Sequence, residues 1–216
     1  MAEMRAFLEA VVGRAAGPEG GSAAEVAEAA RRARVRTAVL LEGLSDLAAV
    51  EALAAARGRD LAAEGVAAVP MGGAMSVGRF AALLGPPGLG LRLAGLCDAN
   101  ERGWYERGLA RAGAPGDGIF VCAADLEDEL VRALGTARIE EVFRSAGDLP
   151  AWRIFERQPA QRERTPQQRL RRFLGTRKGR KIRYGRLLVE ALDPAAVPAP
   201  LDGLFRYLGT APTPHC

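Results

Sequence analysis

The stretch TAVLLEGLSDLAAVEALAAARG, residues 37–58, predicts a buried strand, a glycine turn and a helix in succession. It opens with a short apolar run, which is typical of a strand covered on both faces. Glu42 ends this run, and a second carboxylate, Asp46, follows in the first turn of the expected helix. Acids are costly to place beside a core, so this pair either caps a helix at the surface or forms part of a site.

The same alternation of strand and helix continues along the chain. Three further strand-like segments are residues 65–73, 91–98 and 118–125, and helix-like segments follow them at 75–84, 101–112 and 126–135. This order predicts an α/β fold with a mostly parallel four-stranded sheet flanked by helices. Beyond about residue 136 the chain reads as helical. We therefore predict an N-terminal helical segment (1–35), an α/β domain (36–148) and a basic helical C-terminal extension (149–216) that packs on the same domain.

Composition narrows the classes of function. The only histidine is His215, which excludes catalysis by Ser-His-Asp or Cys-His groups and a histidine-held zinc ion. The three cysteines lack the C-x-x-C spacing of a zinc site or a disulfide framework, which predicts a reducing, cytoplasmic setting. The start of the chain does not read as a secretory signal, and no apolar run is long enough to span a membrane. An enzyme of this composition would depend on carboxylates, lysine, arginine or an oxygen-held metal.

Polar residues follow the ends of the predicted strands. The second strand ends in the glycine turn Gly72-Gly73. The acids and the amide at the other three strand ends are Glu42, Asp46, Asp98, Asn100, the adjacent Glu101, Asp125, Glu127, Asp128 and Glu129. Carboxyl ends of parallel strands meet at one edge of a sheet, so we expect these groups to converge. Clustered carboxylates repel one another unless a cation compensates, and such oxygen ligands suit Mg²⁺, Mn²⁺ or Ca²⁺.

The positive charge is concentrated late in the chain, which has a formal net charge of +4. Residues 151–190 contain 13 Arg and Lys against three acids, and the densest run is RKGRKIRYGR, residues 177–186. We take as candidates for binding phosphate or nucleic acid the glycines of the turn and four cations of this run: Gly72, Gly73, Lys178, Arg180, Lys181 and Arg183. A basic segment beside an acidic edge predicts metal-assisted phosphodiester chemistry.

Several of these motifs together resemble a known family. The segments VLLEGLSDLAAVEAL, VPMGG, LCDAN and DLEDEL, with a late lysine segment, resemble the toprim domain, in particular that of OLD (overcoming lysogenisation defect) nucleases. The resemblance covers roughly residues 36–210. It implies a compact Rossmann-like sheet and a nuclease that cleaves nucleic acid, with DNA as the expected substrate and Mg²⁺ or Mn²⁺ as the cation.

Position by position, the resemblance also assigns roles. The metal ligands it implies are Glu42, Asp46, Asp98, Asn100 and Glu127. The residues it implies for catalysis are Glu42, Asp98 and Lys181, with Lys178 as the alternative lysine. Water is the expected nucleophile, since no tyrosine falls in a motif for a covalent intermediate.

The sequence departs from the family pattern in two ways. Asn100 stands where the second acid of an Asp-x-Asp motif is expected, which could weaken one metal site, shift the ligand to Glu101 or signal lost catalysis. The chain also contains no G-x-x-x-x-G-K-[ST] motif, so it reads as a toprim protein without the family's ATPase. Two alternatives to the nuclease stay open, and Asn100 favours the first of them. One is a catalytically degenerate module that binds nucleic acid or a separate ATPase. The other is hydrolysis of a small phosphorylated or nucleotide substrate.

Overall fold

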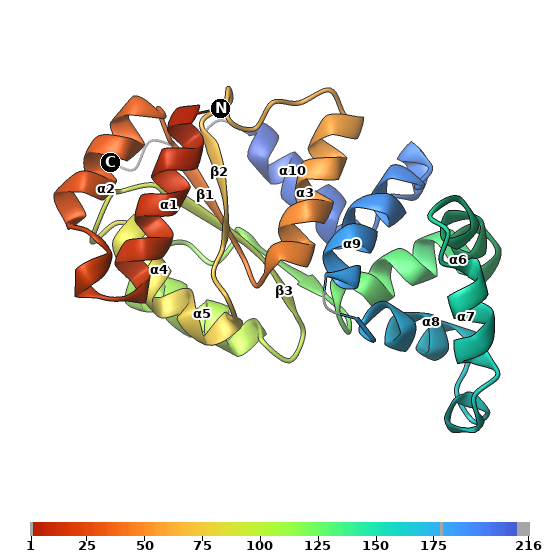
Figure 1. Cartoon of the computed structure of the whole chain (residues 1–216). Helices are drawn as coiled ribbons and strands as arrows, with labels where there is room; N and C mark the ends of the chain where they lie inside the picture. Colours follow the sequence, from red (N-terminus) through yellow and green to blue (C-terminus); the bar gives the residue numbers. More distant parts are fainter. Residues whose placement is uncertain (1, 178, 211–216) are drawn as a thin grey trace.

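A parallel sheet organises the structure, a computed structural model that describes residues 2–177 and 179–210 (Figure 1). Its strands are β1 (Thr37–Leu41), β2 (Val66–Pro70), β3 (Arg92–Asp98) and β4 (Ile119–Cys122), in the order β2-β1-β3-β4. All neighbouring strands are parallel. The predicted α/β class is therefore confirmed.

The register aligns the carboxyl ends of the strands. Leu41 of β1 lies opposite Pro70 of β2 and Leu96 of β3. Asp98 of β3 lies opposite Cys122 of β4. Whatever follows Leu41 therefore emerges beside the last residues of β3, at one edge of the sheet.

Each face of the sheet has its own hydrophobic core, because alternate side chains of a strand point to opposite faces. Ala38 and Leu40 of β1 face one core, and Val39 and Leu41 face the other. The first core is covered by α1 (Ala2–Ala16), α2 (Ala23–Arg32), α4 (Val77–Leu84) and α5 (Arg102–Arg111). The second is covered by α3 (Leu44–Ala56), α6 (Leu126–Ser145), α9 (Arg180–Glu190) and α10 (Ala199–Gly209) (Figure 1). Both the N-terminal helices and the C-terminal helices thus bury part of the sheet.

Two further helices complete a lobe beside the sheet. They are α7 (Leu149–Glu156) and α8 (Pro166–Leu174), which pack with α6 and α9 (Figure 1). Short 3₁₀ turns occur at Pro18–Gly20, Ala74–Ser76, Pro159–Gln161 and Pro194–Ala196. Aromatic rings fill the lobe, with the centroid of Phe143 5.1 Å from those of Phe173 and Tyr184. Trp152 is buried against Phe143 and Phe173, so it packs the core of the lobe.

Helix α9 approaches α3 very closely at Gly185. A Cβ atom built on Gly185 would lie 2.6 Å from the carbonyl oxygen of Ser45, in the first turn of α3. Only glycine permits this approach without displacement. The contact fixes α9, and the residues of its first turn, against the turn that follows β1.

Two of the three cysteines, Cys97 and Cys122, are free and buried in the strands. Burial raises the pKa of Cys97 to about 12, which makes its thiol inert. In the described ranges no helix combines the length and apolarity needed to cross a bilayer.

Candidate functional site

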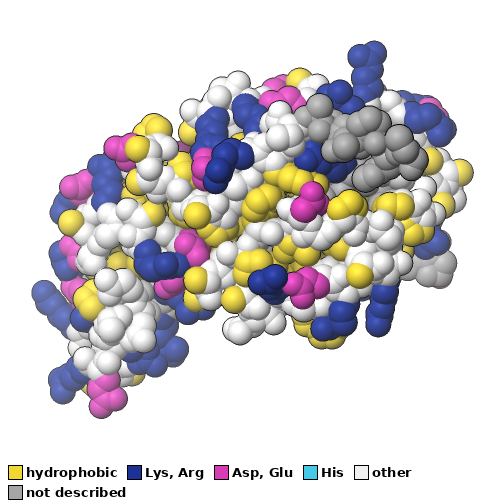
Figure 2. Space-filling model, turned by 180° about the vertical axis from the view of Figure 1, so that it is seen from behind, with side chains coloured by type: hydrophobic (Ala, Val, Ile, Leu, Met, Phe, Trp, Pro, Cys, Tyr) yellow, Lys and Arg dark blue, Asp and Glu magenta, His cyan; other side chains and the backbone are white. Residues whose placement is uncertain are grey.

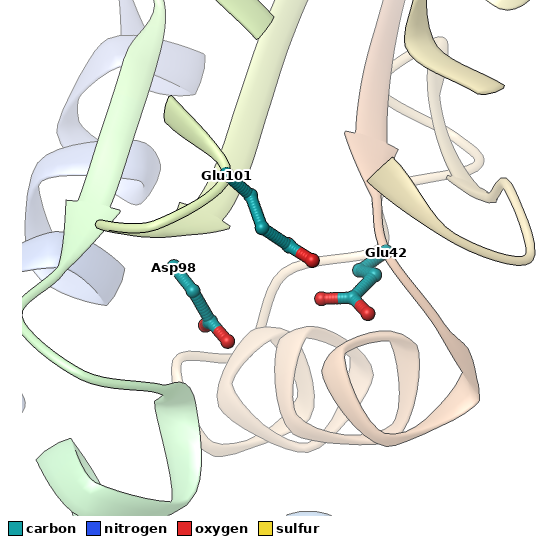
Figure 3. Close-up of side chains that lie close together, drawn as sticks. All are labelled: Glu42, Asp98 and Glu101. Atoms are coloured by element: carbon teal, nitrogen blue, oxygen red, sulfur yellow. The ribbon is translucent and has the colours of Figure 1, made fainter. Parts of the chain in front are cut away.

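Three carboxylates converge at the carboxyl edge of the sheet (Figure 3). Glu42 directly follows β1, Asp98 ends β3, and Glu101 stands just before α5. One ligand oxygen from each lies within 4.8 Å of the others, and all three residues are partly buried. Figure 3 shows the three side chains pointing toward one another below the strand ends.

Burial and the neighbouring charges oppose the ionisation of Asp98 and Glu101. Burial, and then the charges of Asp125 and Glu42, raise the pKa of Asp98 to about 7. Burial, and then a hydrogen bond with Glu42 and its charge, raise the pKa of Glu101 to about 8. Two carboxylates can share a hydrogen bond only when one of them carries a proton. With both ionised, Oε2 of Glu101 is a buried acceptor without a donor.

A divalent cation fits this set of donors. All the converging atoms are carboxylate oxygens, and the spacing is compatible with ligands about 2.0–2.6 Å from a shared ion. The orphaned oxygen of Glu101 is one that an ion would satisfy. A cation would also offset the burial and the repulsion that raise the pKa values of Asp98 and Glu101. The residues present therefore suit Mg²⁺, Mn²⁺ or Ca²⁺.

Glu101 was not assigned as a ligand from the sequence, although it was the neighbouring acid to which the site could shift from Asn100. It lies three residues after Asp98, and its backbone N–H donates to the Asp98 carbonyl at 2.9 Å, so the turn brings both side chains to the same side. Asn100, the expected ligand, is exposed in that turn. The signal in the sequence was the acid directly after the Asp-x-Asn pair, but the direction of each side chain depends on the turn.

Asp46 has a capping role beside the close group. Its Oδ2 accepts a hydrogen bond from the Gly43 N–H at 2.9 Å, at the start of α3. Its pKa is raised to about 6, mainly by burial and also by the charges of Glu127 and Glu42, against the effect of this hydrogen bond. Among the described residues the close group of three does not include Asp46. It contributes negative charge next to the group.

Glu127 and Lys181 form an ion pair at the border of the site. Glu127 is buried in the first turn of α6, and its Oε1 lies 3.2 Å from Nζ of Lys181. The contact lacks the angles of a hydrogen bond, so this oxygen keeps an unused lone pair. Burial alone would lower the pKa of Lys181, but the charges of Glu127, Asp125 and Asp98 raise it, and the side chain stays cationic at neutral pH.

The choice of lysine here is unusual for this chain. Only two of its 30 basic residues are lysines, Lys178 and Lys181. Lys178 lies outside the described residues. Lys181 is presented by the first turn of α9, which the close approach of Gly185 holds against α3.

The glycine turn after β2 borders the edge that carries Glu42. The N–H of Gly73 donates to the carbonyl of Glu42 at 3.0 Å. Gly72 and Gly73 have φ angles of 72° and 126°, which favour glycine. Both residues therefore fix the backbone of the site, and their role in binding phosphate stays a prediction.

Two arginines lie elsewhere than the sequence suggested. Arg180 is buried, donates to the carbonyl of Phe173 at 3.2 Å, and its guanidinium stacks 4.0 Å from the centroid of that ring. It shares the inward face of α9 with Tyr184, one helical turn later. Arg183 donates to the Ala146 carbonyl at 2.8 Å and pairs with Asp148 at 3.3 Å. Arg180 thus packs the lobe instead of facing a phosphate, and Arg183 ties α9 to the segment between α6 and α7.

This fold and this site define a class: a parallel α/β protein with a carboxylate cluster for a divalent cation at the carboxyl edge of its sheet. Residues 35–99 match a family model described as "Overcoming lysogenization defect protein-like, TOPRIM domain". The matched segment contains Glu42, the glycine turn and Asp98. The predicted resemblance to an OLD-type toprim domain is confirmed.

Solved structures are similar over more of the chain. The C-terminal region of the Burkholderia pseudomallei OLD protein is 20% identical with a TM-score of 0.57, over 81% of this chain and 96% of that one. The C-terminal region of the Xanthomonas campestris pv. campestris OLD protein is 23% identical with a TM-score of 0.59, over 81% and 94%. At these identities the similarity establishes the fold. No curated protein matches the sequence.

Proposed function

We propose that this protein is a nuclease that hydrolyses phosphodiester bonds of nucleic acid, with DNA as the expected substrate and Mg²⁺ or Mn²⁺ as the cation. The observation that carries the proposal is the convergence of Glu42, Asp98 and Glu101 within 4.8 Å at the carboxyl edge of the sheet. The match of residues 35–99 to the OLD-like toprim family supports nucleic acid as the substrate class.

The residues of the site have separate tasks in this proposal. Glu42, Asp98 and Glu101 hold the cation, and their repulsion favours its binding over an empty cluster. When bound, the cation supplies Lewis-acid activation of water and phosphate. Lys181, held in place by Glu127, donates to a phosphate oxygen and offsets the charge that develops on it.

Two of the three tyrosines, Tyr105 and Tyr184, have hydroxyls bound within the fold, which supports water as the nucleophile. The hydroxyl of Tyr105 donates to the carbonyls of Leu40 and Leu96 inside the core. The hydroxyl of Tyr184 donates to Asp148 at 2.8 Å. Both groups are committed to the fold, and burial raises their pKa values further from neutrality.

Cleavage of supercoiled plasmid, linear duplex and RNA with each metal tests the proposal. Glu42→Gln keeps the size of the side chain and removes its charge, and the exposed Glu9→Gln on α1 is the matched control. We expect cleavage that requires the cation, is lost by a factor of at least about 10² in Glu42→Gln, and persists in Glu9→Gln. Equal cleavage by the two variants would contradict the proposal.

Asn100 favours a second candidate function, a degenerate module that binds nucleic acid or a separate ATPase without cutting. Its amide stands where the family pattern expects an acid, and it is exposed. Tight binding of nucleic acid with no cleavage in any divalent metal would support this candidate. Glu101 favours the nuclease, because it brings a third carboxylate into the group without Asn100.

A further inference from the structure

A cationic groove lies next to the carboxylate site, between the start of α6, helix α8 and the start of α9. It encloses about 550 Å³. Four cations line it, Arg164, Arg171, Arg172 and Lys181, against one acid, Asp125. The space-filling view shows Lys and Arg side chains gathered at the end of the molecule that α7 and α8 form, at lower left (Figure 2).

Only part of this positive charge is neutralised by the protein. Nε of Arg171 donates to Oδ2 of Asp125 at 2.6 Å, and the other oxygen of Asp125 caps α6 through the Asp128 N–H. This buried acid fixes the direction of Arg171. In the part of the chain that the structure describes, Arg164 and Arg172 have no carboxylate within ion-pair distance. The groove therefore keeps positive charge available for a polyanion.

Lys181 joins the groove to the site. It lines the groove and also pairs with Glu127 at 3.2 Å. The charge of Glu127 in turn acts on Asp98 and Asp46. A phosphate chain lying along the groove would therefore reach the carboxylates at Lys181.

We propose that this groove binds the sugar-phosphate backbone of double-stranded DNA and guides one strand to the carboxylate site. The inference rests on the proposed function. The groove offers arginine, lysine, glutamine and threonine side chains, which bind phosphate, and none of its lining residues is aromatic. Stacking on aromatic rings is the usual means of holding single strands, and the rings of this lobe are buried in its core. Contacts with the backbone alone do not distinguish sequence.

Binding of the full chain to a DNA duplex in EDTA, over a series of salt concentrations, tests the groove without cleavage. The variant is Arg164→Gln with Arg172→Gln, and the matched control is Arg111→Gln with Arg144→Gln, two exposed arginines outside the groove. Both double variants lose the same charge, so a general field effect would weaken them equally. We expect the groove variant to bind about tenfold more weakly or worse near 0.1 M salt, with a log–log salt slope smaller by about two. The control should bind like the wild type.

Three results would overturn the inference: equal weakening of the two double variants, no binding of duplex by the wild type, or tighter binding of single strands that the groove variant abolishes. Thermal melting of both variants checks that they fold. The outcomes distinguish failure of the groove proposal from failure of the proposed function. Duplex binding through the groove without cleavage in any metal would contradict the nuclease and support the groove. Metal-dependent cleavage together with normal DNA binding by the groove variant would support the nuclease and contradict the groove. If both proposals hold, the groove variant should raise KM for duplex while kcat stays near the wild-type value.

Discussion

The carboxylate cluster and the cationic groove are neighbours that the fold holds in different ways. Glu42 and Asp98 are attached directly to the ends of two paired strands, and Glu101 follows by one turn. Lys181 and Arg171 extend from helices and are directed by buried acids, Glu127 and Asp125 respectively. The backbone thus forces the acids together against their repulsion, whereas the cations are placed by attraction. Losing a strand-end acid should therefore remove chemistry, and loosening a helix should misplace charge.

Asp98→Asn should have the largest effect on activity and an opposite effect on stability. We expect cleavage to fall by about 10²–10³, since the substitution removes a central ligand. Burial and the neighbouring acids oppose ionisation of Asp98. The metal-free variant should therefore melt at a higher temperature than the wild type at pH 8. Plasmid cleavage and calorimetry in EDTA measure the two effects. A variant that is both less stable and less active would mean that Asp98 has a structural role instead.

A comparison of the metal dependence of Glu101→Gln and Asn100→Ala identifies the third ligand. We expect Glu101→Gln to raise the metal concentration for half-maximal activity by more than about tenfold, at a cost of about 1.4 kcal/mol or more in cation binding. Asn100→Ala should change it little, because its amide is exposed. Metal titrations of both variants give the answer. The reverse order would restore Asn100 as the ligand.

Asn100 and Glu101 also show what could not be predicted from the sequence, namely which side chain of a turn faces the site. The positions of Glu42 and Asp98 were predictable, because continuous apolar runs and parallel pairing place both at one edge of the sheet. This placement depends on the backbone and not on the conformations of neighbouring side chains. The difference between Asn100 and Glu101 depends on the φ and ψ angles of a single turn. Arg180 and Lys181 are adjacent in a basic run, yet one packs on Phe173 and the other pairs with Glu127. Composition predicted the charge of α9 but not which of its faces the lobe would bury.

Gly185→Ala should move Lys181 and the start of α9 away from the carboxylate cluster. The new Cβ would lie 2.6 Å from the Ser45 carbonyl, so α9 must move away from α3 and take Lys181 with it. We expect a loss of about 1–3 kcal/mol in the free energy of unfolding and reduced cleavage. Gly78→Ala is the control, because Gly78 lies exposed in α4 with no atom within 4 Å of its built Cβ. That substitution should stabilise the protein by up to about 1 kcal/mol. Urea denaturation of both variants checks this, and equal effects would contradict the close approach.

The smallest expected effect is the dependence of cation-induced stabilisation on pH. The pKa values of Asp46, Asp98 and Glu101 are raised to about 6, 7 and 8 in the folded chain, mainly by burial. The folded state therefore keeps protons that the unfolded state has released, and metal-free stability falls as pH rises from about 4 through 8. Lys181 contributes nothing to this slope, since its raised pKa keeps it charged throughout.

A cation competes with these protons, so the rise in melting temperature that Mg²⁺ or Mn²⁺ causes should grow between pH 5 and pH 8. The expected increase is a few degrees, and Glu101→Gln should flatten it because the highest of the three raised pKa values is removed. Differential scanning fluorimetry with and without metal across this range measures the effect, with Glu9→Gln as the control. A shift that is independent of pH would mean that the cation binds away from the crowded carboxylates. The three carboxylates would then not be the ligands of the cation, whereas the groove would be unaffected because DNA binding in EDTA tests it separately.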